Sequence, residues 1–245
     1  EDVEGMITTF GSVPFRDNQA HRDSTQVSRL RRAGAIPVAK TNTPEFGFTA
    51  ITKNLVFGDT RSPWDLTRSP GGSSGGSAAL ITAGVLPLVT ASDGGGSIRI
   101  PASFVGAYGL KPSQGRVPRG PFKSWDTSKT SVYGPLTKTV ADAAFFLDVV
   151  AGLSIDDPES LPTPTTSYVE QLNRPLNRPL RIAYSRDLGF AVVQSDIAAA
   201  VEDSVNVLAG LGHEITEIQG GPAELGEIWK KLGDFKLAGI FAPHL

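Results

Sequence analysis

Two serine-glycine clusters constrain this chain more than any other feature of its sequence. One runs from Ser69 to Ser77 and the other from Ser92 to Arg99. Because glycine has no Cβ atom, clustered glycines mark places where the backbone turns tightly or approaches another group closely. Composition alone also fits a flexible linker for the first cluster. However, an apolar helix and strand pattern follows it directly over residues 77–90, so we predict ordered loops that flank one helix-strand unit.

The rest of the chain alternates between helical and extended patterns. Apolar residues recur at helical spacing over 23–33, 77–84, 140–151 and 197–212. Short apolar runs bounded by turn residues predict strands over 35–39, 85–90, 181–184 and 213–218. Residues 52–76 have no sustained periodicity, which indicates a long ordered loop, and residues 224–245 have helical character. This alternation favours an α/β fold with a largely parallel or mixed sheet.

The overall composition is that of an ordinary globular protein. Of 245 residues, 40% are hydrophobic and 20% are charged, and 23 Lys and Arg against 25 Asp and Glu give a net charge of -2. This balance provides no basic surface for nucleic acid. The absence of cysteine excludes disulfides, thiolate metal sites and a cysteine nucleophile. No run of about 18 apolar residues is present, so no membrane span is expected. The compartment stays open, with the cytoplasm favoured.

Two common glycine-rich motifs fit the clusters poorly. Neither cluster contains the G-x-x-x-x-G-K-[ST] pattern of a phosphate-binding loop. The first cluster matches G-x-S-x-G around Ser73 and again around Ser74, as in the nucleophile elbow of α/β-hydrolases, but that elbow requires a preceding strand and residues 61–70 read as a loop. A Ser-His-Asp hydrolase stays as an alternative. We interpret the three histidines as surface or structural residues: His21, His213 and His244.

Serine catalysis without histidine remains, in which a neutral lysine accepts the proton and a second serine passes it along. The two clusters, GGSSGGS over 71–77 and DGGGSIRIPA over 93–102, strongly resemble the amidase signature family. The resemblance covers at least residues 1–152, with further matches over 5–12, 40–47, 106–118 and 134–152. It implies that family's fold, an α/β arrangement in which helices cover both faces of a mixed central sheet.

The resemblance also implies a Ser-Ser-Lys triad. In this family the nucleophile is the serine that ends the second glycine cluster, which is Ser97 here. The bridging serine is the first of the Ser-Ser pair, Ser73, and the resemblance places a cis peptide bond before it, beside the permissive Gly72. Ser97 is therefore expected to attack the substrate, and Ser73 is expected to relay the proton.

The second cluster is suited to stabilise negative charge. Gly94, Gly95 and Gly96 have no side chains to shield their amides. Their N–H groups, together with that of Ser97, are expected to converge on the oxygen of a tetrahedral intermediate. Each donor in such an oxyanion hole is typically worth roughly 10²–10³ in rate.

Residues flanking the two clusters are expected to support them rather than to transfer protons. Asp93 and Arg99 lie on either side of the glycine turn, and we expect them to fix its geometry through hydrogen bonds and charge. Ser74 and Thr90 are expected to be supporting hydroxyls, because serine and threonine in loops mostly bond nearby backbone groups.

The proton acceptor of the triad falls outside the chain. In the family, the lysine lies shortly before the segment that matches residues 5–9, which places it about three residues ahead of Glu1. Lys40, Lys53 and Lys111 have a structural context in the family and are not assigned as the base. We therefore expect residues 1–245 to be an internal segment of one amidase signature domain that lacks its lysine-bearing and C-terminal parts. These 245 residues alone are expected to be inactive.

The function implied by the resemblance is hydrolysis of a small-molecule carboxylic amide through a serine acyl-enzyme, with no metal or organic cofactor. Ile100 stands where the family members that act on charged tRNA usually carry a polar residue, which favours a general amidase. Phe46 to Phe48 and residues 121–125 are candidates for an apolar acyl or aryl pocket. A homodimer is kept open. The alternative from another class is a non-catalytic amidase-like subunit that binds amides without hydrolysing them.

Overall fold

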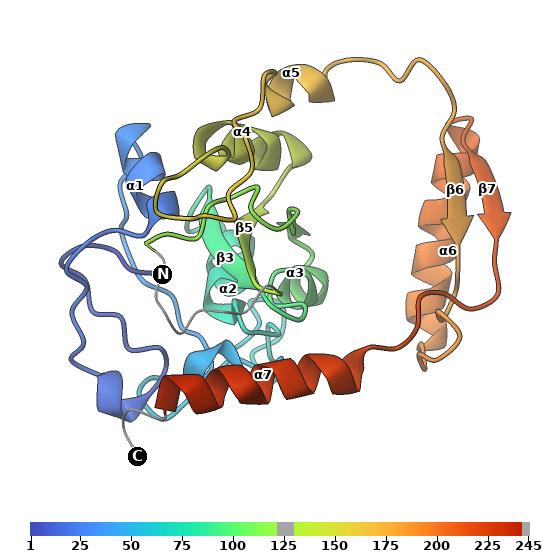
Figure 1. The fold of residues 1–245 in the computed structure, drawn as a ribbon. Helices are drawn as coiled ribbons and strands as arrows, with labels where there is room; N and C mark the ends of the chain where they lie inside the picture. The colour runs from blue at the N-terminus through green and yellow to red at the C-terminus, as the bar shows by residue number, and fades with distance from the viewer. Residues whose placement is uncertain (122–129, 242–245) are drawn as a thin grey trace. The chain divides into compact units, whose positions relative to one another are not determined.

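The computed structural model describes residues 1–121 and 130–241 (Figure 1). The chain divides into two compact units, one formed by Glu1–Asn173 and Lys236–Leu245 and the other by Arg174–Phe235. The expectation of one domain over residues 1–245 stays a prediction.

The first unit is built on a three-stranded antiparallel sheet. Its central strand, β5 (Val132–Thr137), pairs on one side with β3 (Val89–Asp93) and on the other with β4 (Tyr108–Gly109). The register places Val89 opposite Leu136 and Asp93 opposite Val132. Pairing with β5 therefore fixes the position of the end of β3, where the second glycine cluster begins.

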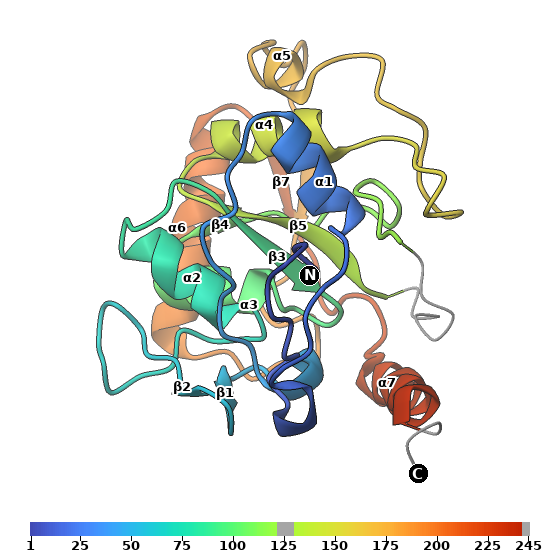
Figure 2. The same ribbon diagram turned by 90° about the vertical axis from the view of Figure 1, so that its left-hand side faces the viewer.

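Helices cover both faces of this sheet (Figure 2). The helices α2 (Gly75–Thr82) and α3 (Arg99–Val105) pack against one face, and the buried residues there include Ile81, Ile98 and Leu136. The helix α4 (Val140–Val150) packs against the other face, where Tyr133 contacts a second cluster of buried residues. Because successive side chains of a strand point to opposite faces, Tyr133 and Leu136 of β5 serve different layers.

Local signals explain where several helices begin and end. The hydroxyl of Thr139 accepts a hydrogen bond from the N–H of Asp142 at 3.1 Å, which caps α4 as its sequence predicts. The helix α1 (Thr25–Arg32) contacts α4. The short helix α5 (Tyr168–Leu172), which follows α4 in the chain, contacts α4 as well. The predicted long loop over residues 52–76 is confirmed apart from the two-residue strands β1 (Lys53–Asn54) and β2 (Gly58–Asp59) and its last two residues, which belong to α2. Two 3-10 turns occupy Val13–Phe15 and Glu45–Gly47.

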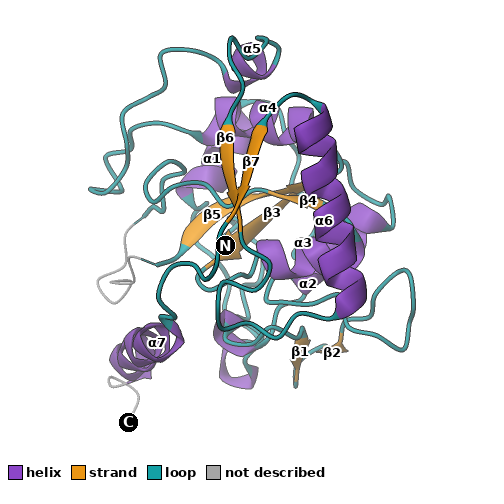
Figure 3. Ribbon diagram, turned by 90° about the vertical axis from the view of Figure 1, so that its right-hand side faces the viewer, coloured by secondary structure: helices purple, strands orange, loops and turns teal. Residues whose placement is uncertain are grey.

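The second unit contains a parallel strand pair. The strands β6 (Arg181–Tyr184) and β7 (Glu214–Glu217) are hydrogen-bonded in parallel, and α6 (Ser195–Gly210) connects them (Figure 3). The helix α7 (Gly226–Phe241) begins in this unit, whose last residue is Phe235. Among residues 1–121 and 130–241, no helix is both long and apolar enough to pass through a bilayer.

The predicted α/β class is confirmed, but two local predictions of strands were wrong. Residues 35–39 form no strand, and the exposed side chains of Ile36 (83%) and Val38 (62%) show why apolar character misled the prediction. The strand expected over 85–90 starts only at Val89. The sheet of the first unit is antiparallel, and within the described part of the chain parallel pairing occurs between β6 and β7. The sequence patterns also missed α3 and β5.

Adjacent phenylalanines of α4 provide a test of the packing. Phe146 is 1% exposed and Phe145 is 63% exposed. We expect Phe146→Ala to lower the free energy of unfolding by about 3–5 kcal/mol, because it removes a ring from a close-packed layer. Phe145→Ala should change it by less than about 1 kcal/mol. Urea unfolding of both variants would measure this, and equal losses would contradict the assignment of the core face.

Candidate active site

A buried carboxylate organises the second glycine cluster. Asp93, the last residue of β3, is 1% exposed. Its Oδ1 accepts a hydrogen bond from the N–H of Gly96 at 2.7 Å, and its Oδ2 accepts one from the N–H of Ile98 at 3.2 Å. The guanidinium of Arg99 donates to both oxygens, each at 2.9 Å. The turn between β3 and α3 is therefore wrapped around a single carboxylate.

Opposing effects act on the ionisation of this carboxylate. Burial raises the pKa of Asp93, but the hydrogen bonds from Arg99 and Gly96 and the positive charge of Arg99 outweigh burial and leave the pKa below its usual value. In turn, the hydrogen bond to Asp93 raises the pKa of Arg99. Asp93 is thus held as an anion, and it acts on the turn as an acceptor rather than as a proton carrier.

The hydrogen bond from Gly96 changes the expected set of oxyanion donors. The N–H of Gly96 donates to Asp93, so it is not free to bind the oxyanion as the sequence predicts. The N–H groups of Gly95 and Ser97 have no hydrogen-bond partner within residues 1–121 and 130–241. Gly94 lies against Ser131, whose Oγ would be 2.8 Å from a Cβ added there. Its place in the oxyanion hole stays a prediction.

The first glycine cluster forms a buried turn that leads into α2. Residues 71–78 are buried, and the peptide bond between Gly72 and Ser73 is cis, at the position that the sequence resemblance indicates. A Cβ atom added to Gly72 would lie 3.0 Å from backbone atoms of residues 49–51, so the turn packs tightly against the preceding loop at this glycine. On its other side, Ser73 lies beside Gly47, where an added Cβ would be 3.2 Å from the Ser73 Oγ.

The two clusters meet at Ser74 and Ser97. The N–H of Ser74 donates to the carbonyl oxygen of Ser97 at 3.3 Å. The Oγ of Ser74 also bridges to β3, because it accepts from the N–H of Ser92 at 3.3 Å and donates to the Ser92 carbonyl at 3.4 Å. The structure therefore brings together the segments that carry both predicted catalytic serines. Ser73 is 5% exposed, whereas Ser97 is half-buried.

Residues of the loop before the first cluster hold it in place through contacts that the sequence patterns do not predict. The carbonyl of Asn42 accepts the N–H of Gly76 at 3.1 Å, and the hydroxyl of Thr41 is 2.9 Å from that of Ser77. The hydroxyl of Ser77 in turn donates to the carbonyl of Thr90 at 2.9 Å. Thr90 thus supports the cluster through its carbonyl group, whereas the sequence predicts support through its hydroxyl. The resemblance over residues 40–47 includes Thr41 and Asn42, but it does not give their contacts, which depend on how distant segments pack.

The three lysines considered in the sequence have structural contacts. The Lys40 Nζ donates to the hydroxyl of Thr8 at 2.8 Å and to the carbonyl of Glu1. Lys53 lies 4.0 Å from the carboxylate of Asp59, and Lys111 donates to a neighbouring carbonyl at 2.8 Å. These contacts give no reason to assign any of the three lysines as the catalytic base.

The Ser-His-Asp alternative is not supported. No strand precedes Ser73, because the chain from residue 60 to residue 74 is irregular, so the strand-to-helix elbow does not form. His21 is exposed, and the Nδ1 of His213 accepts a hydrogen bond from the N–H of Leu180 at 3.3 Å. His244, like residues 122–125 of the suggested apolar pocket, lies outside the described residues.

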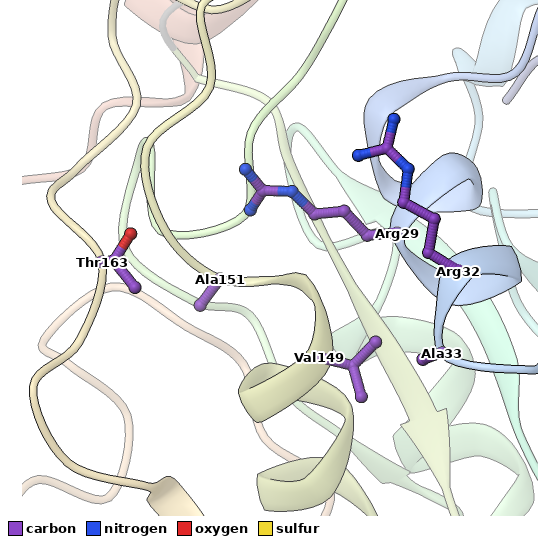
Figure 4. A pocket seen from close by; sticks show the side chains of 6 residues that line it. All are labelled: Arg29, Arg32, Ala33, Val149, Ala151 and Thr163. Atoms are coloured by element: carbon purple, nitrogen blue, oxygen red, sulfur yellow. The ribbon is translucent and has the colours of Figure 1, made fainter.

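A shallow pocket elsewhere in the first unit is structural. It has a volume of about 440 Å³ and is lined by Arg29, Arg32, Ala33, Val149, Ala151 and Thr163 (Figure 4). The guanidinium of Arg29 donates to the carbonyls of Val150 at 2.6 Å, Gly152 at 3.1 Å and Leu153 at 2.6 Å. Burial and the nearby charge of Arg32 lower the pKa of Arg29. The guanidinium thus ties α1 to the chain after α4, and neither predicted catalytic serine lines this pocket.

The fold and the joined clusters define a class of protein: an α/β protein with a glycine turn at a half-buried serine, next to a second serine that follows a cis peptide bond. Comparison with known proteins is more specific. The family model described as Amidase matches residues 1–231. An acylamidase of Rhodococcus erythropolis is 42% identical over 98% of this chain and 49% of its own length. A glutamyl-tRNA(Gln) amidotransferase subunit of Syntrophobacter fumaroxidans is 40% identical over 88% of this chain and 44% of its own length.

Solved structures agree with this assignment. A bacterial aryl acylamidase of the amidase signature family has a TM-score of 0.90 at 30% identity, over 99% of this chain and 50% of that one. A 6-aminohexanoate cyclic dimer hydrolase has a TM-score of 0.87 at 30% identity, over 96% of this chain and 53% of that one. The chain belongs to the amidase signature family, and it spans about half the length of the relatives that it matches.

The buried carboxylate leads to a prediction about stability and pH. Asp93→Asn should lower the free energy of unfolding at pH 7 by about 2–3 kcal/mol, because it weakens several hydrogen bonds to a charged acceptor. Since folding lowers the pKa of Asp93, this stabilisation is complete above the ordinary carboxyl pKa of about 3.9 and is lost as the pH falls through the lowered value. Urea unfolding between pH 7 and pH 2 measures the difference.

The matched control is Asp59→Asn, which removes a surface ion pair with Arg61 at 2.9 Å. It should cost less than about 1 kcal/mol at pH 7. A difference between wild type and Asp93→Asn that stays constant down to the lowest pH would contradict the account of this carboxylate.

Proposed function

We propose that the full-length protein hydrolyses carboxylic amides through an acyl-enzyme on Ser97. The observation that carries this proposal is the hydrogen-bonded contact between the two clusters, in which the Ser74 N–H donates to the Ser97 carbonyl. This contact holds the segment of the proposed relay serine, Ser73, against that of the proposed nucleophile. Membership of the amidase signature family and the similarity to amide-hydrolysing enzymes support the same reaction.

The proposed reaction begins with proton transfer. A neutral lysine of the full-length protein, located ahead of Glu1, accepts a proton from the Ser73 hydroxyl, and the Ser73 oxygen takes the proton of Ser97. The Ser97 Oγ then attacks the amide carbon and forms a tetrahedral intermediate. The proton returns through Ser73 to the nitrogen of the leaving amine, the C–N bond breaks, and water hydrolyses the acyl-enzyme by the reverse relay.

The oxyanion of the intermediate is stabilised by the turn after β3. We assign this role first to the N–H groups of Gly95 and Ser97, which have no other partner within the described ranges. Asp93 and Arg99 act as supports, because their contacts with the turn fix the direction of its amides before the substrate binds. Donors that are already oriented need no reorganisation when charge develops, and this is the main source of their effect on rate.

The substrate class is a general amide rather than a charged tRNA. Ile100, on the first turn of α3, supports this choice, because the family members that act on charged tRNA usually carry a polar residue at this position. The acylamidase similarity is in line with it. The non-catalytic alternative differs in its outcome: such a subunit would bind amides and leave them intact. A homodimer and a cytoplasmic location stay predictions.

Substitutions of the two serines in the full-length protein test this proposal. Ser97→Ala should abolish amide hydrolysis, because no other group replaces the nucleophile. Ser73→Ala should lower kcat by about 10²–10⁴-fold without unfolding the protein, the size of effect expected for loss of general acid-base transfer. Initial rates on an anilide of a simple acyl group, with circular dichroism to verify folding, measure both variants.

The matched control is Ser103→Ala, which removes an exposed hydroxyl of α3 that donates to the carbonyl of Ile100 at 2.9 Å. It should leave kcat within about twofold of wild type, as surface substitutions usually do. Full activity in purified Ser97→Ala would reject the proposed nucleophile, and a folded wild-type protein that binds an amide without hydrolysing it would favour the non-catalytic alternative.

A further inference from the structure

One buried hydroxyl spans the turn that carries Ser73. Thr52 precedes β1 and is 1% exposed. Its Oγ1 donates to the carbonyl of Gly71 at 2.9 Å and accepts a hydrogen bond from the N–H of Gly75 at 3.1 Å. A longer contact joins the same oxygen to the carbonyl of Ser73 at 3.4 Å. A single side chain therefore ties together both ends of the turn, with the cis Gly72–Ser73 peptide bond between them.

Close packing makes this hydroxyl difficult to replace. A Cβ atom on Gly75 would overlap the Oγ1 of Thr52, and one on Gly72 would press on the backbone of residues 49–51. Burial leaves no route for bulk water to the carbonyl of Gly71 and the N–H of Gly75. If the hydroxyl is removed, both groups lose a partner inside the protein, which is costly for buried polar groups. The turn is then expected to shift in order to satisfy them.

Such a shift would act on the proton path more than on the nucleophile. Ser73 lies within the bridged turn, whereas Ser97 lies on the turn after β3, which Asp93 holds by separate hydrogen bonds. Small displacements of a catalytic group are enough to lower rates by about a hundredfold. The step most sensitive to Ser73 is protonation of the leaving amine, because an amine is a poor leaving group unless it receives a proton.

We infer that Thr52 is a positioning residue for Ser73, which it holds in line for proton transfer to the leaving group. This inference rests on the proposed function. The hydroxyl of Thr52 bonds to Gly71, Ser73 and Gly75 rather than to Ser97, so Thr52 acts through the turn that its hydroxyl bridges.

The test compares two substrates of the full-length protein that share one acyl group. An anilide requires proton delivery to its nitrogen, whereas a p-nitrophenyl ester releases a stable phenolate that does not. Thr52→Val keeps the shape of the side chain and removes the hydroxyl. It should lower kcat/KM on the anilide by about 10–100-fold and lower that on the ester by a factor at least about threefold smaller, because the ester needs Ser73 to activate Ser97 but not to protonate the leaving group. Thr52→Ser, which keeps the hydroxyl, should stay within about threefold of wild type on both substrates.

The ratio of the two rates does not depend on how much of the preparation is folded, so it separates a positioning role from a stability role. If Thr52→Val yields too little protein, Thr52→Ala provides the same ratio. Thr49→Val is the matched control, because its exposed hydroxyl donates to the carbonyl of Ile51 at 2.8 Å in the same loop. Its ratio should equal that of wild type.

Two outcomes would overturn the inference, and they differ from a failure of the proposed function. An unchanged ratio in Thr52→Val and Thr52→Ala, or a Thr52→Ser variant as impaired as Thr52→Val, would show that the hydroxyl does not position Ser73. If Ser97→Ala retained wild-type rates on both substrates, the proposed function itself would be wrong. An inactive Ser97→Ala together with an unchanged ratio would reject only the role of Thr52.

Discussion

The compensation of one buried negative charge shapes the proposed catalytic turn. An ion as buried as Asp93 requires strong partners, because transfer of a charge out of water is costly. The partners come from the turn itself: the N–H groups of Gly96 and Ile98 and the guanidinium of Arg99. The hydrogen bonds that compensate the charge of Asp93 also fix the conformation of the turn, and so they set the directions of the Gly95 and Ser97 amides.

The second cluster depends on the same core. The helices α2 and α3, which follow the two glycine clusters, pack on one face of the β3–β5–β4 sheet around Ile81 and Leu136. Ser74 adds polar links from the first cluster to β3 and to Ser97. The half-buried proposed nucleophile and the buried proposed relay serine thus rest on one packed layer, which is what a reaction that depends on small distances needs.

The sequence predicted the parts of this arrangement that depend on local chemistry. The cap at Thr139, the ordered glycine loops and the segments bearing both serines follow from residues close together in the chain. Features set by distant contacts were missed. The partner of β3 is β5, far along the chain, so antiparallel pairing left no local pattern. The bond from Gly96 to Asp93 and the bridge made by Thr52 likewise depend on how the backbone closes, which the glycine-rich pattern alone does not specify.

The central claim is that Ser97 forms a covalent bond to the acyl group. Rapid acid quenching of the full-length protein during turnover of a p-nitrophenyl ester, followed by peptide mass mapping, tests it most directly. The account predicts that the mass of the acyl group appears on the peptide containing residues 94–99, with fragmentation placing it on Ser97. An adduct on Ser73 or on any other side chain, or steady turnover with no acylated peptide under the same quench, would contradict it.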